Sequence, residues 1–312
     1  MESVALMKAT VVINPIAGPG RARTLDACAA LARESLGRGG FDADVRITTA
    51  PDDAQRFAAA AVEAGHALVV AWGGDGTVNG VGAALAGTPV AMAIIPGGSG
   101  NGLARDLDLP LDAAAAFEVA ASGSARLIDA GELNGSLFFN VAGIGLDARI
   151  AMRMAAPGAR RGLLGYVVAT LSELPSYVAR DYSITPLNGA GGSPFATSAL
   201  FIAMANSRQY GNGAQIAPHA RLDDGELDLV VVRPQSLLRI ASRIPAFFNG
   251  SLRADETLWM RTAAEMDISS DHDISFHVDG EPRQGATTVA LRTRPRTLQV
   301  RVTLGRQPFR RG

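Results

Sequence analysis

The strongest constraint on the fold is a short apolar run that ends in a glycine-rich turn, VVAWGGDGTVNG at residues 69–80. Residues 69–72 are β-prone and are bounded by glycine, which is typical of a buried strand. The three glycines that follow allow the backbone to adopt positive φ and to approach a ligand closely. An ordinary turn between a strand and a helix needs only one glycine. The three glycines and Asp75 therefore favour a polyphosphate site, with the N-terminus of the next helix directed at it.

Strands, turns and helices alternate through the first part of the chain. Buried strands are predicted at residues 9–13, 45–49, 67–72 and 91–95. Helices are predicted at residues 22–36 and from the N-cap Thr49 to about Ala64. The fourth strand also runs into a glycine-rich turn, PGGSGNG. Alternation of this kind, up to about residue 122, predicts a parallel, doubly wound sheet, and ligands bind such sheets at the carboxyl ends of the strands.

The pattern changes after about residue 130. Short β-rich segments follow one another, among them SLFFNVAGIG, SALFIAMANS, ELDLVVV, DISFHVDG, TTVALRT and TLQVRVTL. Two stretches of helical character interrupt them, at residues 148–180 and 235–250. We therefore expect an α/β nucleotide-binding domain at residues 1–130 and a β-rich antiparallel sandwich at residues 131–312. The prediction leaves open that the extreme C-terminus packs on the first domain.

Composition narrows the class of protein. The 312 residues are 47% hydrophobic and 19% charged, as in a soluble globular protein with a sizeable core. The net charge of −1 gives no reason to expect a nucleic acid as partner. The single cysteine, Cys28, suits a reducing compartment. No signal peptide is recognisable at the N-terminus, and no apolar run approaches the roughly 20 residues of a membrane span, so a cytoplasmic location is predicted.

Lysine is almost absent from the chain, with Lys8 as its only example. A Walker A loop needs GxxxxGK[ST], and protein kinases need a lysine on a strand for the α- and β-phosphates. The chain contains neither arrangement. If the protein handles ATP, it uses backbone amides, a metal ion and arginine instead.

Five sequence blocks stand in one order along the chain: NPIAGPGRA, GGDGTVNG, PGGSGNGLARDL, ANS…APHARLDDGELDL and HVDGEP. In this order they resemble the diacylglycerol kinase-like lipid kinases, a family that includes soluble bacterial lipid kinases and the sphingosine and ceramide kinases. The resemblance spans nearly the whole chain. GGDGT alone also occurs in NAD kinases, so it is the combination of blocks that is specific for the family.

The resemblance implies a set of site residues for this chain. Those implied to contact ATP are Asn14, Pro15, Ile16, Ala17, Gly18, Thr49, Gly73, Gly74, Asp75, Gly76, Thr77, Val78, Asn79, Gly80, Gly98, Ser99 and Asn101. Asp279 and Glu281, in HVDGEP, occupy the segment that carries the catalytic base. Asp224 is implied to ligate a structural Mg²⁺, with the backbone carbonyls of Arg221 and Glu226 completing the site.

Two positions depart from the family pattern. Relatives commonly have Glu where Gly80 stands, and an acidic residue often follows the Asn where Gly102 stands. Both changes thin the acidic lining of the predicted nucleotide site. A non-catalytic protein that binds nucleotide or lipid and has lost turnover is therefore an alternative interpretation.

The carboxylates also have plainer interpretations. Asp279 follows a β-run and precedes Gly280, so the pair can be a polar hairpin turn as well as a catalytic site. Residues 223–225 can likewise be only a turn, although Mg²⁺ takes the carboxylate and carbonyl oxygens that such a turn offers. Asp75 is the first-domain carboxylate that we expect to organise the metal of MgATP, through water. The four histidines show no metal spacing, and none is assigned to the chemistry.

A lipid substrate requires contact with a membrane surface. Residues 236–252 form a predicted amphipathic helix with Arg239 and Arg243 beside its apolar face, which suits an interface or, alternatively, packing on the core. Residues 160–171 offer the same two interpretations. We therefore expect a cytoplasmic protein that associates transiently with membranes, and a homodimer is left open.

These observations lead to one predicted activity, the transfer of the γ-phosphate of MgATP to a lipid hydroxyl. The cleft between the two domains is expected to hold MgATP and the acceptor. Diacylglycerol is the default acceptor, and a sphingoid base, ceramide or another lipid alcohol is the alternative. An NAD kinase is a further alternative, against which LARDL and LDDGELD speak.

Overall fold

A computed structural model describes residues 6–17, 24–156, 158, 162–187, 193–211 and 213–305. They form two compact units. The first unit contains the described residues up to Ile128 and those from Arg296 onward, and the second contains Asp129–Pro295. Two strands, β5 (Ser124–Leu133) and β18 (Thr288–Val302), begin in one unit and end in the other.

A parallel sheet forms the centre of the first unit. Its strands lie in the order β2-β1-β3-β4, and Val300 of β18 extends it by pairing in parallel with Met92 of β4. The bounds are β1 Met7–Ile13, β2 Phe41–Ile47, β3 Leu68–Gly73 and β4 Ala91–Pro96. The predicted doubly wound, mostly parallel sheet is confirmed.

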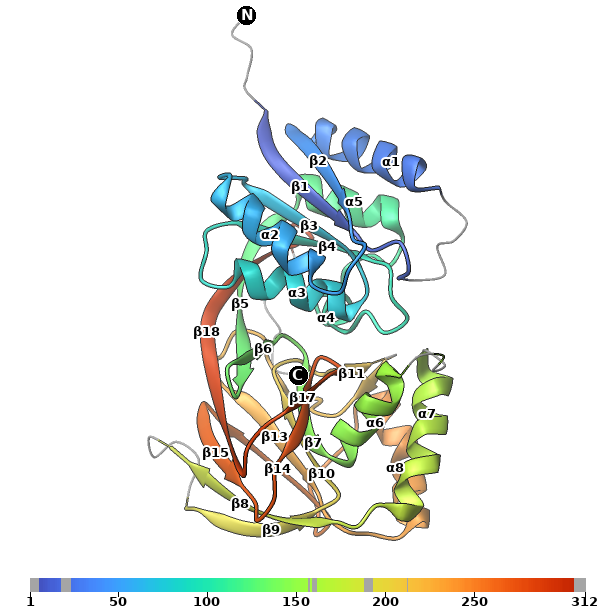
Figure 1. The fold of residues 1–312 in the computed structure, drawn as a ribbon, viewed down its shortest axis with the longest axis vertical. Coiled ribbons are helices and arrows are strands. Elements are labelled where there is room, and N and C mark those ends of the chain that lie inside the picture. The colour runs from blue at the N-terminus through green and yellow to red at the C-terminus, as the bar shows by residue number, and fades with distance from the viewer. Residues whose placement is uncertain are drawn as a thin grey trace, which may run out of the picture. The chain divides into compact units, whose positions relative to one another are not determined.

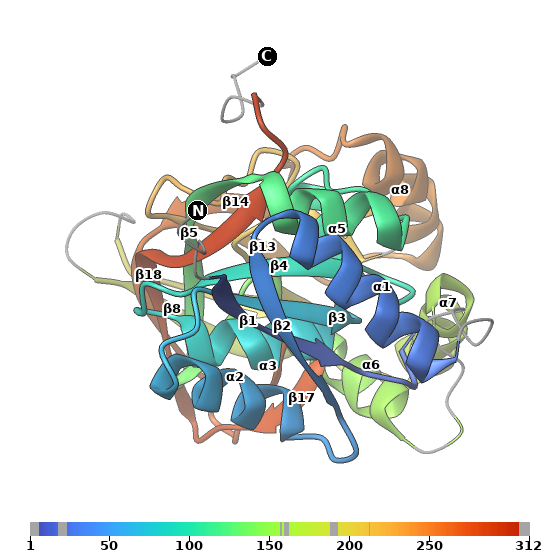
Figure 2. The same ribbon diagram turned by 90° about the horizontal axis from the view of Figure 1, so that it is seen from above.

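Helices cover both faces of this sheet (Figure 2). On one face α1 (Leu25–Arg38) packs beside α5 (Ala113–Ser122), and on the other α2 (Asp53–Glu63) packs beside α3 (Asp75–Leu85). A short helix, α4 (Gly102–Asp106), follows β4. On the α1 and α5 side the core joins strand residues such as Val11 and Val70 to Phe117 of α5.

The second strand begins earlier than predicted. Instead of residues 45–49 it spans Phe41–Ile47, and its side chains alternate between buried and exposed at its start. It lies at the edge of the sheet, where its polar positions Asp42, Asp44 and Arg46 face solvent. A search for continuous apolar runs therefore misses its first half, because an edge strand does not need to be apolar on both faces.

The second unit is an antiparallel sandwich. One sheet has the strand order β14-β13-β10-β7-β16-β17, and the other contains β18-β15-β8-β9 with the hairpin β5-β6 beside β18. A small hairpin, β11-β12, is separate. The bounds are β6 Ser136–Phe138, β7 Val141–Gly145, β8 Arg180–Pro186, β9 Phe195–Ala199, β10 Phe201–Ala205, β11 Gln209–Gly211, β12 Ala214–Gln215, β13 Leu227–Val232, β14 Leu258–Ala263, β15 Glu265–Ser269, β16 Ser275–Val278 and β17 Glu281–Gln284.

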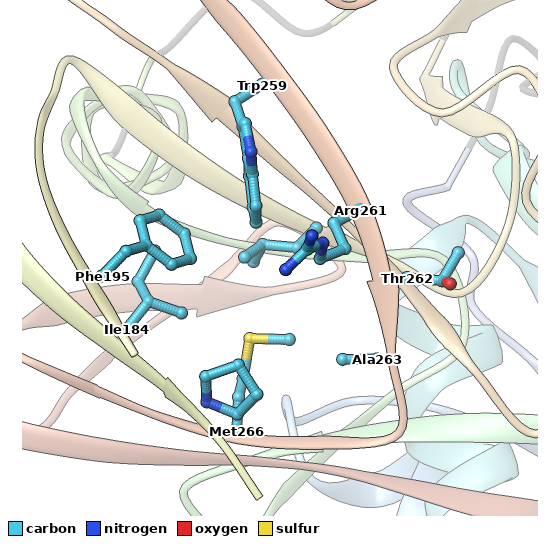
Figure 3. Close-up of a pocket in the computed structure, with 9 residues that line it drawn as sticks. Ile184, Phe195, Trp259, Arg261, Thr262, Ala263 and Met266 are labelled. Atoms are coloured by element: carbon cyan, nitrogen blue, oxygen red, sulfur yellow. The ribbon is translucent and has the colours of Figure 1, made fainter. Parts of the chain in front are cut away.

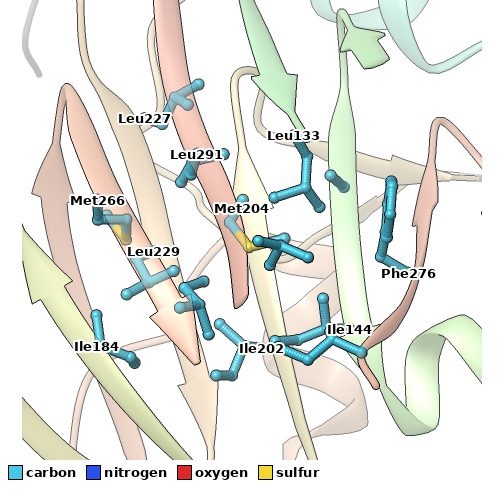
Figure 4. Close-up of a cluster of buried hydrophobic side chains, with 14 of the residues drawn as sticks. Leu133, Ile144, Ile184, Ile202, Met204, Leu227, Leu229, Met266, Phe276 and Leu291 are labelled. Carbon is cyan, nitrogen blue, oxygen red and sulfur yellow. The ribbon is translucent and has the colours of Figure 1, made fainter. Parts of the chain in front are cut away.

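Apolar side chains from both sheets of the sandwich gather in one buried cluster. Figure 4 shows Ile202 and Met204 of β10 together with Met266 of β15 and Leu291 of β18. All four are at most 2% exposed. The predicted β-rich antiparallel second half is therefore confirmed, and the alternation of apolar residues along its strands corresponds to this shared core.

Three helices belong to the second unit (Figure 1): α6 (Leu146–Ala155), α7 (Gly162–Glu173) and α8 (Leu237–Asn249). A 3₁₀ turn at Leu174–Ser176 follows α7, and β8 already begins at Arg180, so the predicted helical stretch 148–180 is too long at its end. α6 packs on β7, β16 and β17. None of the helices in the described part of the chain is long and apolar enough to cross a membrane.

Candidate active site

The carboxyl edge of the parallel sheet collects most of the residues predicted to bind nucleotide. Asn14 follows β1, Thr49 lies just beyond β2, Gly74 follows β3, and Gly97 follows β4. The strand order β2-β1-β3 means that the chain leaves β1 toward one side and later enters β3 on the other. Ligands of such sheets bind where this reversal occurs, in this protein between the ends of β1 and β3.

Asn14 connects the turn after β1 to the glycine turn after β3. Its Nδ2 donates to Oγ1 of Thr77 at 3.1 Å, and its Oδ1 accepts the backbone N–H of Ile16 at 3.1 Å. Its own N–H donates to the carbonyl of Trp72 at 2.9 Å. The two predicted nucleotide segments are thus held together by one side chain at the point where the sheet reverses.

The two glycine turns pack backbone against backbone. The N–H of Gly97 donates to the carbonyl of Gly73 at 2.8 Å. A Cβ atom on Gly98 would lie 2.6 Å from Cα of Gly74, a distance that real side chains do not reach. Glycine is required at position 98 by this close approach, and the turn after β4 is consequently locked to the turn after β3.

Asp75 reinforces this contact with its side chain. Its Oδ1 accepts the backbone N–H of Gly102 at 2.7 Å, and its Oδ2 accepts that of Asn101 at 3.1 Å. Asn101 has the left-handed conformation (φ 50°), and its side chain accepts from and donates to the backbone of Gly98. Asp75 therefore joins the two turns directly. Its predicted part in organising a metal ion stays a prediction.

The turn after β2 differs from the prediction. Asp52, not Thr49, is the N-cap of α2, and it makes no capping bond with its side chain. Instead Oδ2 of Asp53 accepts the N–H groups of Thr49 and Ala50 and the hydroxyl of Thr49. The Thr49 amide, followed by Arg56 and Ala50, holds the pKa of Asp53 well below its usual value. Thr49 is thereby fixed at the carboxyl edge by a side chain from α2.

The other predicted nucleotide residues lie in three settings. Pro15, Ile16, Gly76 and Ser99 are exposed, and Ala17 is partly exposed, at the turns themselves. Val78, Asn79 and Gly80 lie along α3, where a Cβ on Gly80 would touch Ala54 of α2 at 3.4 Å. The position at which relatives commonly have Glu thus faces the neighbouring helix. Gly18 lies outside the described residues.

In the second unit Asp279 occupies a tight hairpin turn between β16 and β17. Val278 pairs with Glu281, and both central residues, Asp279 (φ 47°) and Gly280 (φ 87°), have positive φ, as a type I′ turn requires. Glu281 is exposed at the start of β17. The hairpin interpretation is therefore correct for the backbone, but it does not account for the Asp279 side chain.

The Asp279 carboxylate turns back into the protein and binds three successive amides. Its Oδ2 accepts the N–H of Phe139 at 2.9 Å, and its Oδ1 accepts those of Asn140 and Val141 at 2.9 and 3.1 Å. Backbone donors of this kind favour the charged form of a carboxylate. Its orientation is consequently defined by residues about 140 positions earlier in the chain.

Two buried polar residues that we did not predict, Asn206 and Ser207, support the segment that carries those amides. Asn206 donates from Nδ2 to the carbonyl of Phe139 and to that of Asp129, both at 3.0 Å, and its N–H donates to the carbonyl of Asn140. The hydroxyl of Ser207 donates to Oδ1 of Asn140 at 3.0 Å. The ANS block of the sequence contains Asn206 and Ser207, and polar residues at the end of an otherwise apolar strand are the signal for their role.

The acidic turn at residues 221–228 carries an excess of negative charge. Burial raises the pKa of Asp224, and the charges of Glu226 and Asp129 add to the effect. Burial and the charges of Asp224 and Glu226 raise the pKa of Asp228 to about 7. A side chain from β5 holds the turn, because Oδ2 of Asp129 accepts the N–H of Gly225 at 2.7 Å.

A hard cation fits this donor set, since carboxylate and carbonyl oxygens are its preferred ligands and its charge would offset the repulsion. No cluster of three or more His, Cys, Asp or Glu side chains in the described ranges has metal-binding geometry. The set implied by the resemblance uses carbonyls of Arg221 and Glu226 with only one carboxylate, Asp224. It remains a prediction.

A small apolar pocket lies at the edge of the sandwich (Figure 3). The rings of Trp259 and Phe195 line it, tilted by 53° with their centroids 4.5 Å apart, and the guanidinium of Arg261 lies 5.5 Å from the Trp259 ring. Met266 also lines it. Its cavity volume is about 10 Å³, too small for a ligand, and we assign none to it.

Comparisons with known proteins agree with this arrangement. Residues 8–133 match the family described as the diacylglycerol kinase catalytic domain. Residues 140–302 match the YegS C-terminal NAD kinase beta sandwich-like domain. A protein of Pseudomonas fluorescens named "Probable lipid kinase YegS-like" is 31% identical over 84% of this chain and 86% of its own. A protein of the same name from Pectobacterium atrosepticum is 34% identical over 80% and 84%.

Solved structures share the fold. A crystal structure described as a diacylglycerol kinase from Bacillus anthracis has a TM-score of 0.72 at 21% identity, and it covers 96% of this chain and 97% of that one. A second structure from the same organism has a TM-score of 0.78 at 22% identity, with coverages of 96% and 98%. These likenesses show the fold alone. The family matches and the two relatives establish that the chain is a kinase and belongs to the diacylglycerol kinase-like lipid kinase family.

Proposed function

We propose that this kinase transfers the γ-phosphate of MgATP to the hydroxyl of diacylglycerol and so forms phosphatidate. The observation that carries the proposal is the pair of glycine turns after β3 and β4, Gly73–Gly74 and Gly97–Gly98, joined backbone to backbone at the carboxyl edge of a parallel sheet. Such turns expose amides and leave room for phosphate oxygens. The names of the relatives support a lipid as the acceptor.

Backbone amides take the part that lysine plays in other kinases. Lys8 lies in β1 and its Nζ is paired with Asp42, so it belongs to an exposed ion pair at the surface. α3 begins at Asp75, immediately after the first glycine turn, and its N-terminal amides carry the positive end of the helix dipole. Mg²⁺ bound with ATP would neutralise the charge that develops on the transferred phosphoryl group.

Asp279 is the proposed base for the lipid hydroxyl. Phosphoryl transfer passes through a loose transition state, so correct placement of the acceptor matters more than a strong base. The three amides that hold the Asp279 carboxylate support this kind of role, because they orient both of its oxygens. Asp224, with carbonyls of Arg221 and Glu226, would hold a second, structural Mg²⁺ away from the reacting groups.

The outer face of α8 supports contact with the surface of a membrane. Leu237, Leu238, Ile244 and Phe248 are 44–83% exposed, while Ile240 and Phe247 on the adjoining side of the helix pack against the core. The apolar face of this amphipathic helix is thus turned toward solvent. Arg239 and Arg243 bind Asp255 of the same unit. A lipid kinase must reach a substrate that lies in a bilayer, and an exposed apolar helix face can enter the headgroup region.

Radiolabel transfer from γ-labelled ATP tests the proposal. Mixed micelles would present diacylglycerol, a sphingoid base, ceramide and other lipid alcohols separately, with NAD in a parallel assay. We expect labelled lipid from the wild type and from the control Asp181→Asn, an exposed carboxylate of β8, but not from Asp279→Asn. If a different lipid alcohol were labelled, it would replace diacylglycerol as the proposed acceptor. Absence of label in every acceptor, despite measured ATP binding, would instead indicate a non-catalytic protein.

A further inference from the structure

A buried histidine lies two residues before Asp279 and contacts the same turn. His277 is on β16, whose neighbouring residues Phe276 and Val278 point into the core of the sandwich. Its own side chain points to the other face, which α6 covers, and it is 6% exposed. A histidine in a strand would face solvent on that side if the helix were absent.

Both ring nitrogens of His277 have partners, and these define its tautomer. Nδ1 accepts the backbone N–H of Gly280 at 3.2 Å, and Nε2 lies 2.7 Å from Oδ2 of Asp147. A backbone N–H only donates, so Nδ1 carries a lone pair and the proton resides on Nε2. The imidazole therefore joins the turn that carries Asp279 to a carboxylate in the first turn of α6.

Asp147 is in turn held by a polar network. It is 3% exposed, and its Oδ1 lies 3.2 Å from the hydroxyl of Tyr166, which lies 3.0 Å from the hydroxyl of Tyr210. Gly143, the cross-strand partner of His277, leaves room for the contact between Asp147 and His277. A Cβ atom at position 143 would collide with Oδ2 of Asp147 and with Nε2 of His277. Four elements, β7, α6, α7 and β11, thus shape one histidine site.

We propose that His277 is a positioning residue, which holds the Asp279–Gly280 turn by accepting the Gly280 amide and so keeps the Asp279 carboxylate in the orientation that the amides of residues 139–141 define. This inference rests on the proposed role of Asp279. The Asp147 contact serves to orient the ring so that Nδ1, not Nε2, faces the turn. A carboxylate partner that fixes the tautomer and orientation of a histidine is a recognised arrangement in active sites.

Two substitutions separate the contacts of the ring. Asn places its Oδ1 close to the position of Nδ1, so His277→Asn keeps an acceptor for Gly280 and loses the donor to Asp147. Gln reaches further, so His277→Gln keeps the donor to Asp147 and loses the acceptor near Gly280. If the Gly280 contact positions Asp279, kcat of His277→Asn should stay within about threefold of the wild type. His277→Gln should lower kcat about tenfold or more, which corresponds to about 1.4 kcal/mol of lost transition-state stabilisation.

Stability should follow the opposite order. His277→Asn leaves the buried Asp147 carboxylate without its partner, so it should unfold at lower urea than His277→Gln. If His277 had only a structural role, the less stable variant, His277→Asn, would also be the less active one. KM for ATP should stay within about twofold in both, because a change in kcat alone is expected when an interaction with the reacting group is lost. His272→Gln, in the turn before β16, is the matched control and should leave both properties unchanged.

An amide-exchange measurement tests the contact without turnover. We expect slow exchange of the Gly280 N–H in the wild type and in His277→Asn and faster exchange in His277→Gln, with ¹⁵N shifts of the wild-type imidazole showing the proton on Nε2. Equal exchange in the two variants, equal kcat in an active enzyme, or a proton on Nδ1 at neutral charge would overturn the inference. If the wild type phosphorylates no lipid while exchange follows the expected order, the proposed function fails and the contact stands.

Discussion

The carboxylate of Asp75, in the first turn of α3, accepts the backbone N–H of Gly102, in the first turn of α4, at 2.7 Å. One side chain thereby ties together the two turns that we propose to bind ATP. The same carboxylate also holds the N–H of Asn101. Its place in the family motif is thus explained by the geometry of the turns, whatever part it takes in binding metal.

Asp75→Asn should weaken ATP binding. The amide of Asn offers one acceptor and one donor, so its NH₂ would face an N–H of Asn101 or Gly102. A donor left without a partner costs about 1–3 kcal/mol, and roughly a tenfold or larger rise in Kd for ATP is expected if the turns are loosened by that amount. Calorimetric titration with ATP measures the effect. Asp44→Asn on the exposed edge of β2 is the control, and an equal Kd in both variants would contradict the prediction.

Gly98→Ala should disrupt the contact between the two glycine turns. The added Cβ would lie 2.6 Å from Cα of Gly74, and neither backbone can move away without separating the turns. We expect ATP binding to be lost and the free energy of unfolding to fall by about 1–3 kcal/mol. Gly37→Ala in α1, where a Cβ meets nothing within 4 Å, should instead be neutral or stabilising by about 0.5–1 kcal/mol. Urea denaturation measures the free energy of unfolding of both variants, and an equal effect of the two substitutions would contradict the prediction.

The His277–Asp147 pair should make stability depend on pH. Burial lowers the pKa of His277, but the charge and hydrogen bond of Asp147, with a contribution from Asp279, raise it more, so its folded pKa exceeds the ordinary 6.5. Tyr166 and Tyr210 face the pair with pKa values raised above 10, and they stay neutral. A raised folded pKa gives stability that is full below about pH 6.5 and is lost as pH rises through the folded pKa.

Asp147→Asn removes the charge that raises the pKa. Its loss of stability relative to the wild type should therefore be larger at pH 6 than at pH 9, as measured by urea denaturation, whereas Asp181→Asn should show no such dependence. Activity should change in the opposite direction, because only neutral His277 accepts the Gly280 amide. We therefore expect the kcat of the wild type to rise over the pH range in which its stability falls. If the stability difference between Asp147→Asn and the wild type did not depend on pH, the proposed effect of Asp147 on the pKa of His277 would be contradicted.

Magnesium should stabilise the second unit through the turn that contains Asp224. A cation that binds only the folded state at 100 times its Kd adds about 2.7 kcal/mol of stability. We expect the melting temperature of the wild type to rise with Mg²⁺ in the absence of ATP, and Asp224→Asn to show a smaller rise. The control Asp181→Asn should respond like the wild type. The same rise in Asp224→Asn would exclude this turn as the site.

Charge on the outer face of α8 should reduce binding to vesicles without unfolding the protein. Leu238 is 83% exposed, so Leu238→Glu removes little buried surface. If this leucine enters the headgroup region, the loss of about 1.5–3 kcal/mol of apolar burial should lower the partition coefficient by about tenfold or more. Ser242→Glu, exposed on the same helix, adds the same charge and should change partitioning by less than about twofold. Sedimentation with diacylglycerol-containing vesicles measures both, and equal binding of the two variants would contradict the proposed surface.

Local signals in the sequence were sufficient for the architecture of the first unit. Val69, Val70 and Ala71 form a continuous apolar run, and the glycines that follow it favour a turn. A central parallel strand and its turn are therefore recognisable from neighbouring residues alone. β2 was only partly predicted, because an edge strand shares its polar alternation with many surface segments.

The candidate site was accessible from the sequence only in part. Asp279 could be singled out by its motif, but a DG turn on its own also describes any hairpin, and the direction of its side chain depends on amides of residues 139–141. The sequence gives no reason to assign His277 to the chemistry, because the four histidines show no metal spacing. His277 is buried nevertheless, since α6 covers its face of β16.

The order of strands, turns and helices could be predicted from short segments of the sequence, because apolar periodicity and glycine act over a few residues. Which carboxylates meet which donors depends on the fold as a whole. The bond from His277 to Asp147 spans 130 positions, and that from Asp75 to Gly102 spans 27. No local propensity encodes such pairs. They form because sheet register and helix packing bring the groups together and because burial leaves each charged or polar atom in need of a partner.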